Sequence, residues 1–262
     1  MLPGHNRAMP AVLEESGLFR FAGLPPGFTA GFTTRRLAPD EVGAAEAARR
    51  LAVALGLTDA ERVRARQVHG RSSIILEAPA VPGEDVLAGE ADALITRERG
   101  RLIAVASADC VPILLLDSET GWMAAVHAGW RGTAARILDV VLDALEARGV
   151  PAARLIAFFG PSISRDRYEV GPEVVGALRR SHERIDVPAE AIRGGAGDRS
   201  FLDVAAFDRA LLLARGVPAG SIRAAGLCCA ERADLFPSFR RDGAGTGRVM
   251  TGIASPVSFR AS

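Results

Sequence analysis

Three side chains that bind metals well, His69, Cys110 and His127, each lie beside a short apolar segment or a glycine. If residues 118–121 form the turn of a hairpin, Cys110 falls opposite Gly129 and His127 lies diagonally across from it, roughly 7–8 Å away at the backbone. Such a thiolate and imidazole can share one zinc ion, at about 2.3 Å for Zn–S and about 2.0 Å for Zn–N. With His69 as third ligand, one position stays open, which is typical of catalytic zinc sites.

The same residues also fit simpler roles. A cysteine that follows or precedes a strand, such as Cys110, is most often a small buried hydrophobic residue. A histidine in front of Ala-Gly, such as His127, is more often a polar residue with satisfied hydrogen bonds than a metal ligand. Arg131 could be an exposed arginine in a first helical turn, and Asp109 could cap a strand end. Spacing alone leaves both interpretations open.

The composition excludes several function classes. The chain has 262 residues, with 32 Lys plus Arg against 31 Asp plus Glu, and all of its basic residues are arginines. Without lysine, neither a Walker-type phosphate loop nor a Schiff-base enzyme is possible. The formal net charge of +1 gives no electrostatic reason to expect nucleic acid or an anionic membrane as partner.

Three cysteines are too few for a disulfide framework, and Cys228 and Cys229 are adjacent in the chain. Residues 1–10 lack the apolar run of a signal peptide, and apolar stretches such as 111–116 are too short to span a bilayer. We therefore expect a soluble protein of the reducing cytoplasm, whose oligomeric state, monomer or dimer, stays open.

Interleaved strands and helices without strict alternation predict a mixed α/β or α+β fold in a single domain over residues 1–262. We expect strands over 102–106, 111–117, 122–126 and 155–159, and a strand pair over 64–76 interrupted at 67–70. We expect helices over 44–55, 133–148, 173–180 and 203–215. Glycine, proline and polar residues predict loops over 1–30, 79–90 and 194–197.

A series of ordered motifs resembles the YfiH-type family, long labelled multicopper polyphenol oxidase or laccase-domain proteins. This family includes purine nucleoside phosphorylases with deaminase activity and a branch called peptidoglycan editing factor. The resemblance covers most of the chain from residue 64 onward. Its motifs are QVHG (67–70), ADAL (91–94), SADCVP (107–112), VHAGWRG (126–132), GPSI (160–163), YEV (168–170), LD (202–203), SFRR (238–241) and TGR (246–248), with Cys228.

The chain departs from the family pattern near its N-terminus. The motif FTTR at 32–35 is present, but the segment 36–46 is short and lacks the usual Gly-Gly loop and Asn-Arg pair. Pro237 stands in place of an aromatic residue, and Cys229 in place of a threonine. These differences concern segments that could shape the substrate pocket.

The resemblance implies mixed β-sheets flanked by helices, a fold also similar to cytotoxic necrotizing factor. It implies a metal on His69, Cys110 and His127, namely Zn²⁺, with Cu²⁺ possible in vitro because such ligands bind copper at least as well. It places Asp109 and Arg131 beside the metal as catalytic residues. The substrate-binding residues that we expect are Gln67, Ser107, Gly129, Arg35 and Arg240. Residues 129–133 form a Gly-flanked loop that leads into a helix, where backbone N–H groups and Arg131 could hold phosphate.

Three functions follow as hypotheses. The first is a purine nucleoside enzyme, which splits adenosine, inosine, guanosine or methylthioadenosine with phosphate, or deaminates adenosine. The second is a Cys110–His127 hydrolase or amidase that acts on cell-wall precursors. The third is a protein that holds a metal without catalysis. A laccase is implausible, because several copper centres need many imidazoles and the chain has four histidines, of which we expect His5 and His182 not to be ligands.

Overall fold

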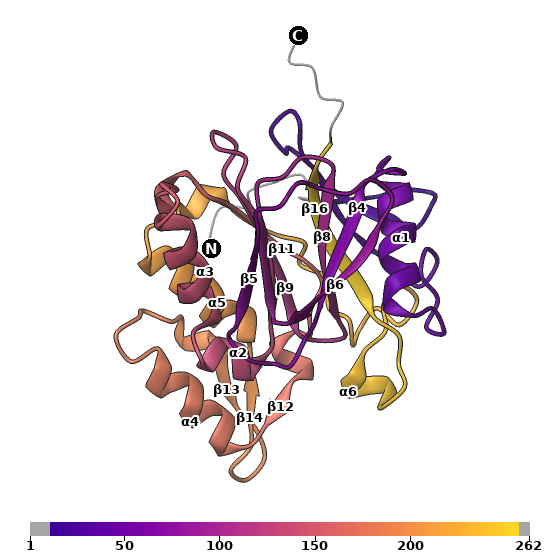
Figure 1. Cartoon of the computed structure of the whole chain (residues 1–262). Coiled ribbons are helices and arrows are strands. Elements are labelled where there is room, and N and C mark those ends of the chain that lie inside the picture. Colours follow the sequence, from indigo (N-terminus) through magenta and orange to yellow (C-terminus); the bar gives the residue numbers. More distant parts are fainter. Residues whose placement is uncertain (1–10, 257–262) are drawn as a thin grey trace.

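A computed structural model describes residues 11–256 as four stacked layers, helix, sheet, sheet and helices (Figure 1). The first sheet has seven strands, and β4 pairs in parallel with β6 and β8 while the other neighbours are antiparallel. In spatial order these strands are β1 (Ala11–Leu13), β2 (Leu18–Phe21), β3 (Thr29–Thr33), β16 (Val249–Ser255), β8 (Arg101–Ser107), β4 (Glu61–Arg66) and β6 (Asp85–Glu90).

The second sheet has six strands and packs face to face on the first. Its strands, in spatial order, are β15 (Ile222–Ala224), β11 (Ile156–Phe159), β9 (Val111–Leu116), β10 (Met123–Ala128), β7 (Ala93–Thr96) and β5 (Ser73–Leu76). A small antiparallel sheet stands beside it, formed by β12 (Glu169–Val170), β14 (Ser200–Leu202) and β13 (Ile192–Gly194).

The helices cover the outer faces of the two sheets. Helix α1 (Ala44–Ala54) packs on the seven-stranded sheet, whereas α3 (Ile137–Glu146) and α5 (Val204–Ala214) cover the six-stranded sheet on the opposite side (Figure 1). The remaining helices are α2 (Trp130–Ala134), α4 (Pro172–Ser181) and α6 (Phe239–Asp242). The expectation of a mixed α/β domain is thus confirmed.

Strand β9 shows why the six-stranded sheet lies in the middle of the molecule. Leu114 and Leu116 point to the seven-stranded sheet, while Ile113 and Leu115 point to the helices. Side chains of a strand alternate between its two faces, so a continuous apolar run needs a cover on both sides. The apolar run that predicted a buried strand is therefore the centre of the core.

The hairpin of β9 and β10 has the expected register. The backbone N–H of Asp117 donates to the carbonyl of Trp122, and Pro112 pairs with His127. Val111 pairs with Ala128, which brings Cys110 opposite Gly129 at the open end of the hairpin. The turn residues and the apolar runs are local features of the sequence, and they were sufficient to predict this register correctly.

Two expected loops contain strands. The segment 1–30 was expected to be a loop, but β1, β2 and the start of β3 lie in its described part, where Phe19 and Phe21 are buried in the core between the sheets. The segment 79–90 ends in β6, an edge strand that pairs with β4. In both cases pairing and burial outweigh the glycines and polar residues that suggested a loop.

The expected helix over 133–148 corresponds to α3, which begins at Ile137, while α2 already starts at Trp130, in the segment 129–133 that was expected to be a loop. Arg136 has a φ of 64° and separates α2 from α3, and its guanidinium bonds to Asp139 and to the carbonyl of Ser181. A left-handed residue cannot continue an α-helix. The apolar spacing continued across this break, because both helices bury a face on the same core.

His182 lies among charged residues in the chain and is nevertheless buried, with 3% of its area exposed. Its ring packs edge-on against Phe207, and Nδ1 lies 2.8 Å from Oγ of Ser181. Charged neighbours suggested a solvated position, but the end of α4 turns this side chain inward against α5. His5 lies outside the described residues.

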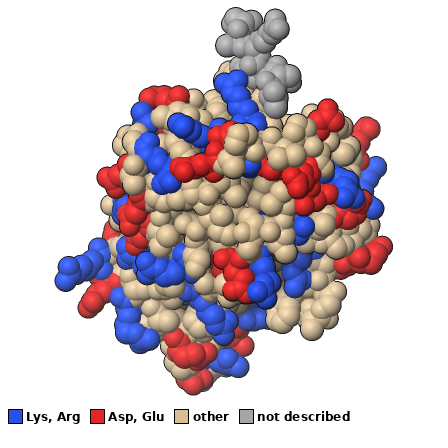
Figure 2. All heavy atoms as spheres, viewed as in Figure 1, with Lys and Arg blue, Asp and Glu red and all other residues tan. Residues whose placement is uncertain are grey.

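No helix within 11–256 is long and apolar enough to cross a membrane. On the face shown in Figure 2, arginines and acidic residues are intermixed, in keeping with a net charge of +1.

Candidate active site

The three expected metal ligands converge at one point. The ligand atoms of His69, Cys110 and His127 all lie within 4.8 Å of one another, and the two imidazole centroids are 4.9 Å apart. His69 lies in the loop from β4 to β5 and Cys110 in the loop from β8 to β9, while His127 belongs to β10. Both loops cross from the seven-stranded to the six-stranded sheet, so the cluster lies where the chain passes between the layers.

The backbone is strained on both sides of this cluster. His69 has a φ of 58° and Asp109 a φ of 85°, values that are unfavourable for residues with a side chain. Such conformations persist only where surrounding contacts hold them, and they concentrate at functional sites. Both unusual conformations thus occur next to the point where the His69 ring and the Cys110 thiol meet.

Asp92 is the residue that holds this arrangement together, and sequence reasoning did not select it. Its carboxylate is fully buried and lies 2.9 Å from Nδ1 of His127. It also accepts the backbone N–H groups of Val68, His69 and Gly70, at 3.2, 3.0 and 2.7 Å. The sequence signal that could have revealed Asp92 is its place as an acidic residue within the apolar segment 91–94. A carboxylate buried in such a segment needs hydrogen-bond partners, and it is therefore a candidate for a role in a site.

The bond to Asp92 defines which nitrogen of His127 faces the cluster. A carboxylate accepts hydrogen bonds, so Nδ1 carries a proton and Nε2 is left for Cys110 or a metal. Burial alone would raise the pKa of Asp92, but the bonds from His127 and Gly70 outweigh it and lower that pKa.

The electrostatics favour a thiolate at Cys110. Burial opposes ionisation of the thiol, but hydrogen bonds from His127 and His69 outweigh burial and lower its pKa to about 6. Burial also opposes a charged His127, yet bonds to Asp92 and Cys110 raise its pKa to about 9. A thiolate and two imidazoles are the donor set that zinc and copper prefer, so the residues present fit a metal ion.

Gly129 is required by the close approach of β10 to the cluster. A Cβ at this position would lie 2.9 Å from Sγ of Cys110 and 3.3 Å from Cδ2 of His69. Any side chain would therefore push the thiol and the imidazole away from each other. Gly129 thus contributes to the site through its lack of a side chain, whereas its expected contact with substrate stays a prediction.

Asp109 precedes Cys110 and is buried at the same spot. Its Oδ2 accepts the backbone N–H of Arg240 at 2.7 Å, and Oδ1 has no partner among the described residues. Burial is the largest influence and raises the pKa of this carboxyl. A buried acid with a free oxygen can exchange a proton with a bound molecule.

A cavity of about 40 Å³ adjoins Cys110 and Asp109 and is bounded by the aromatic rings of Trp130 and Tyr168. The guanidinium of Arg131 lies 4.3 Å from the centroid of the Trp130 ring. Arg240 lies 4.7 Å from the Tyr168 centroid and donates to the carbonyl of Glu169. Trp130 and Tyr168 therefore line the cavity, and each ring has an arginine beside it, but Arg131 is exposed and neither arginine lines the cavity itself. Sequence reasoning did not select Trp130 and Tyr168 as site residues.

Of the other expected binding residues, the side chains of Gln67 and Arg35 have partners within residues 11–256, whereas that of Ser107 has none there. The side-chain amide of Gln67 donates to the carbonyl of Ala106 at 2.7 Å and accepts its N–H at 2.8 Å, which ties the His69 loop to β8. Ser107 is buried, and its hydroxyl has no partner among the described residues. Arg35 bonds to Asp40 with two nitrogens. Their contact with substrate stays a prediction.

Cys228, which belongs to the series of family motifs, is buried, and its Sγ accepts the backbone N–H of Ser164 at 3.2 Å. The guanidinium of Arg241, the neighbour of Arg240, donates to the carbonyls of Cys229, Ala230 and Phe236. Arg241 therefore fastens the loop before α6.

The sequence of this chain is similar to those of known proteins. The family described as multi-copper polyphenol oxidoreductase laccase matches residues 31–255. An adenosine deaminase named RL5, from an unknown prokaryotic organism, is 39% identical over 208 residues, which are 78% of this chain and 78% of that protein. A purine nucleoside phosphorylase of Deinococcus radiodurans is 36% identical over 256 residues, 98% of this chain and 93% of the relative.

The fold agrees with solved structures of the same family. The crystal structure of YlmD from Geobacillus stearothermophilus superposes with a TM-score of 0.81 and 28% identity, and covers 95% of this chain and 100% of that one. The structure of YfiH from Bacillus licheniformis gives a TM-score of 0.80 at 26% identity, over 94% and 98% of the two chains. The chain therefore belongs to the YfiH-type family, which carries the laccase description and includes proteins named purine nucleoside phosphorylase and adenosine deaminase.

Proposed function

We propose that this protein is a metal-dependent purine nucleoside enzyme that splits nucleosides with phosphate, or deaminates adenosine. The observation that carries the proposal is the His69–Cys110–His127 cluster beside a cavity lined by Trp130 and Tyr168, with Arg131 and Arg240 stacked on these two rings. Aromatic rings can stack on a purine, and arginines match the charge and geometry of phosphate. The names of the relatives support the same substrates.

In this proposal His69, Cys110 and His127 hold zinc, and copper can occupy the same ligands in vitro. When bound, zinc supplies a Lewis acid that polarises an oxygen atom of substrate or water. Asp92 orients His127 and the loop of His69 for this task. The three free cysteines agree with the reducing cytoplasm that we propose as its location.

Phosphorolysis breaks the bond between C1′ of ribose and N9 of the base, and a phosphate oxygen forms the new bond to C1′. Arg131 and Arg240 bind and orient the phosphate, while Asp109 delivers a proton to the leaving base. In deamination a water oxygen bonds to C6, the C6–N bond breaks and ammonia leaves. Asp109 then carries protons between the water and the leaving nitrogen.

The laccase description does not extend to the proposed activity. A multicopper oxidase needs several copper centres, and its ligands are mostly imidazoles. The chain has four histidines, and the described residues contain one cluster with metal-ligand geometry. Two of the four histidines belong to that cluster, which is too few for further copper centres.

A second function is favoured by the contact of Asp92 with His127 and by the position of His127 beside Cys110. A carboxylate that orients an imidazole beside a thiol is the arrangement of cysteine hydrolases. In this alternative the metal is absent and Cys110 attacks an amide or ester, for example in a cell-wall precursor. Bound metal would occupy the thiolate and exclude this chemistry.

The deciding experiment is elemental analysis of the purified protein beside Cys110→Ala, followed by assays of adenosine and inosine with and without phosphate. About one zinc per chain, lost in the variant together with phosphate-dependent base release or ammonia release, would support the proposal. A metal-free protein that a thiol alkylator labels at Cys110 would overturn it and favour the hydrolase. Bound metal without turnover of adenosine or inosine would instead support the hypothesis of a protein that holds a metal without catalysis.

A further inference from the structure

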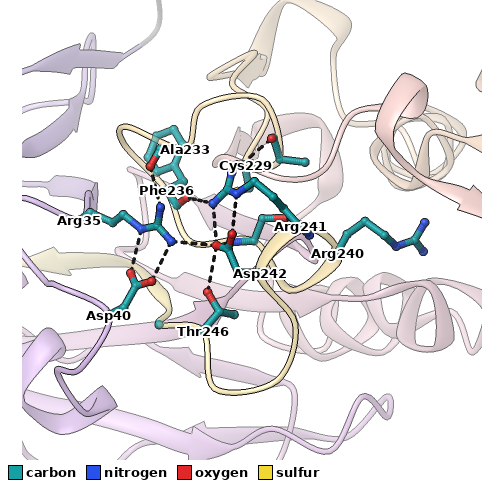
Figure 3. Close-up of polar contacts among 12 residues, drawn as sticks. Arg35, Asp40, Cys229, Ala233, Phe236, Arg240, Arg241, Asp242 and Thr246 are labelled. Atoms are coloured by element: carbon teal, nitrogen blue, oxygen red, sulfur yellow. Dashed lines mark hydrogen bonds and ion pairs between the residues drawn. The ribbon is translucent and has the colours of Figure 1, made fainter.

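Arg35 and Asp242 lie 207 positions apart in the chain and form an ion pair of 2.8 Å next to the site. Arg35 also forks onto Asp40 with bonds of 2.9 and 2.7 Å, and its third nitrogen donates to the carbonyl of Ala233 at 2.6 Å (Figure 3). All three guanidinium nitrogens therefore have protein partners. Arg35 therefore links the chain after β3 to the segment that contains α6.

Helix α6 depends on these polar contacts for its position. None of its four residues is buried, and Phe239 is 55% exposed, so no apolar side chain anchors it. Its last residue, Asp242, accepts bonds from Arg35, from Arg241 and from the backbone N–H of Ser238 (Figure 3). These donors lower the pKa of Asp242 and keep it ionised.

The same helix is in contact with the proposed site. The backbone N–H of Arg240 donates to Oδ2 of Asp109 at 2.7 Å, and Asp109 is the strained residue directly before Cys110. The side chain of Arg240 stands over Tyr168 at the cavity. A shift of α6 would therefore remove the N–H donor from Asp109 and the guanidinium from the Tyr168 ring at once.

We propose that Arg35 and Asp242 are positioning residues, which hold α6 so that Arg240 stays on Asp109 and over Tyr168. This role rests on the proposed function for its effect on catalysis, but its structural part does not. It gives Arg35 a role that does not require the direct substrate contact suggested by the sequence, and that contact stays a prediction. A half-buried pair, with 27% and 26% of the side chains exposed, fits this task because solvent screens it less than a surface pair.

The test compares Asp242→Asn with Asp139→Asn as a matched control. Asp139 is also a half-buried carboxylate held by two arginines, Arg136 and Arg215, but it lies in α3. The first measurement is amide hydrogen exchange of the peptide 236–243. We expect exchange to rise about tenfold or more in Asp242→Asn and to stay at the wild-type rate in Asp139→Asn. Unchanged exchange in Asp242→Asn would overturn the proposal, whatever the protein catalyses.

The second measurement is the kinetics of inosine and phosphate with Asp242→Asn, Arg35→Met and Arg35→Lys. A loosened α6 raises KM for phosphate, about tenfold in the first two variants, because Arg240 is no longer held over Tyr168. Arg35→Lys keeps the charge but not the fork, so its KM falls between wild type and Arg35→Met. Loss of kcat with an unchanged KM in all three would overturn the positioning role. Absence of any nucleoside turnover in the wild type would contradict the proposed function instead, and the exchange result would still stand.

Discussion

Oδ1 of Asp92 lies 2.9 Å from Nδ1 of His127, and the same carboxylate accepts the backbone N–H groups of residues 68, 69 and 70. One buried side chain thus orients one imidazole directly and places the other through its loop. Groups that hold metal-bound histidines are commonly worth a factor of 10–100 in metal affinity. The proposed metal site therefore has four essential side chains, of which one does not touch the metal.

Replacing Asp92 by asparagine tests this relationship. An amide cannot accept from three backbone N–H groups and from Nδ1 of His127 without turning an N–H donor against one of them. We expect zinc affinity to fall about 10–100-fold, measured by competition with a chromogenic chelator. Asp117→Asn is the control, because Asp117 is as buried but lies at the other end of β9. Equal zinc affinity in Asp92→Asn and wild type would remove Asp92 from the site.

Gly129→Ala tests the close packing of the ligands. The new methyl would stand 2.9 Å from Sγ of Cys110, closer than carbon and sulfur can approach, so the thiol must move. We expect less than about half the wild-type zinc content and about 1–3 kcal/mol less stability. Gly220→Ala, where a methyl meets nothing within 4 Å, is the control. Full zinc content in Gly129→Ala would show that the ligands can move apart and still bind the ion.

The ionisation of Cys110 can be followed in metal-free protein. Its pKa of about 6 is lower than that of an ordinary thiol because His127 and His69 stabilise the thiolate. Alkylation by iodoacetamide therefore rises as the pH increases through about 6, rather than near 8.5. Cys110→Ser shows the background from Cys228 and Cys229, which are buried. A midpoint near 8.5 would mean that the imidazoles do not contact the thiol.

Burial of His182 predicts a loss of stability in acid. Burial lowers the pKa of His182 below 6.5, and the positive charge of Arg136 lowers it further. The ring is therefore protonated at a lower pH in the native state than in the unfolded chain. Its contribution to stability is complete above pH 6.5 and decreases as the pH falls below that value, by at most about 1.4 kcal/mol per pH unit. Urea unfolding at about pH 7.5 and about pH 5.5 measures the difference.

His182→Gln, which has no titrating ring, should lose less stability between these two conditions. Ser181→Ala serves as control, because it removes the hydroxyl beside Nδ1 and keeps the ring. A variant whose stability decreases as much as that of wild type would place the acid sensitivity in other groups.

Local patterns in the sequence were sufficient for much of the site. The turn at 118–121 and the apolar runs on both sides define the register of β9 and β10, so the amino-acid order alone pairs Cys110 with Gly129. The ligand chemistry of a thiol and two imidazoles also follows from residue type alone. Period and turn chemistry act over a few residues, and for that reason a sequence reveals them.

Tertiary structure decided what depends on contacts between distant segments. Asp92 and His127 are 35 positions apart, and Arg35 and Asp242 are 207 apart, so no local pattern showed that one orients a ligand and the other supports α6. The loop of His69 reaches the cluster only because the chain crosses between two sheets there. Such contacts form only when the layers pack against each other. Packing buries certain polar groups, and each buried polar group then needs a hydrogen-bond partner from another segment.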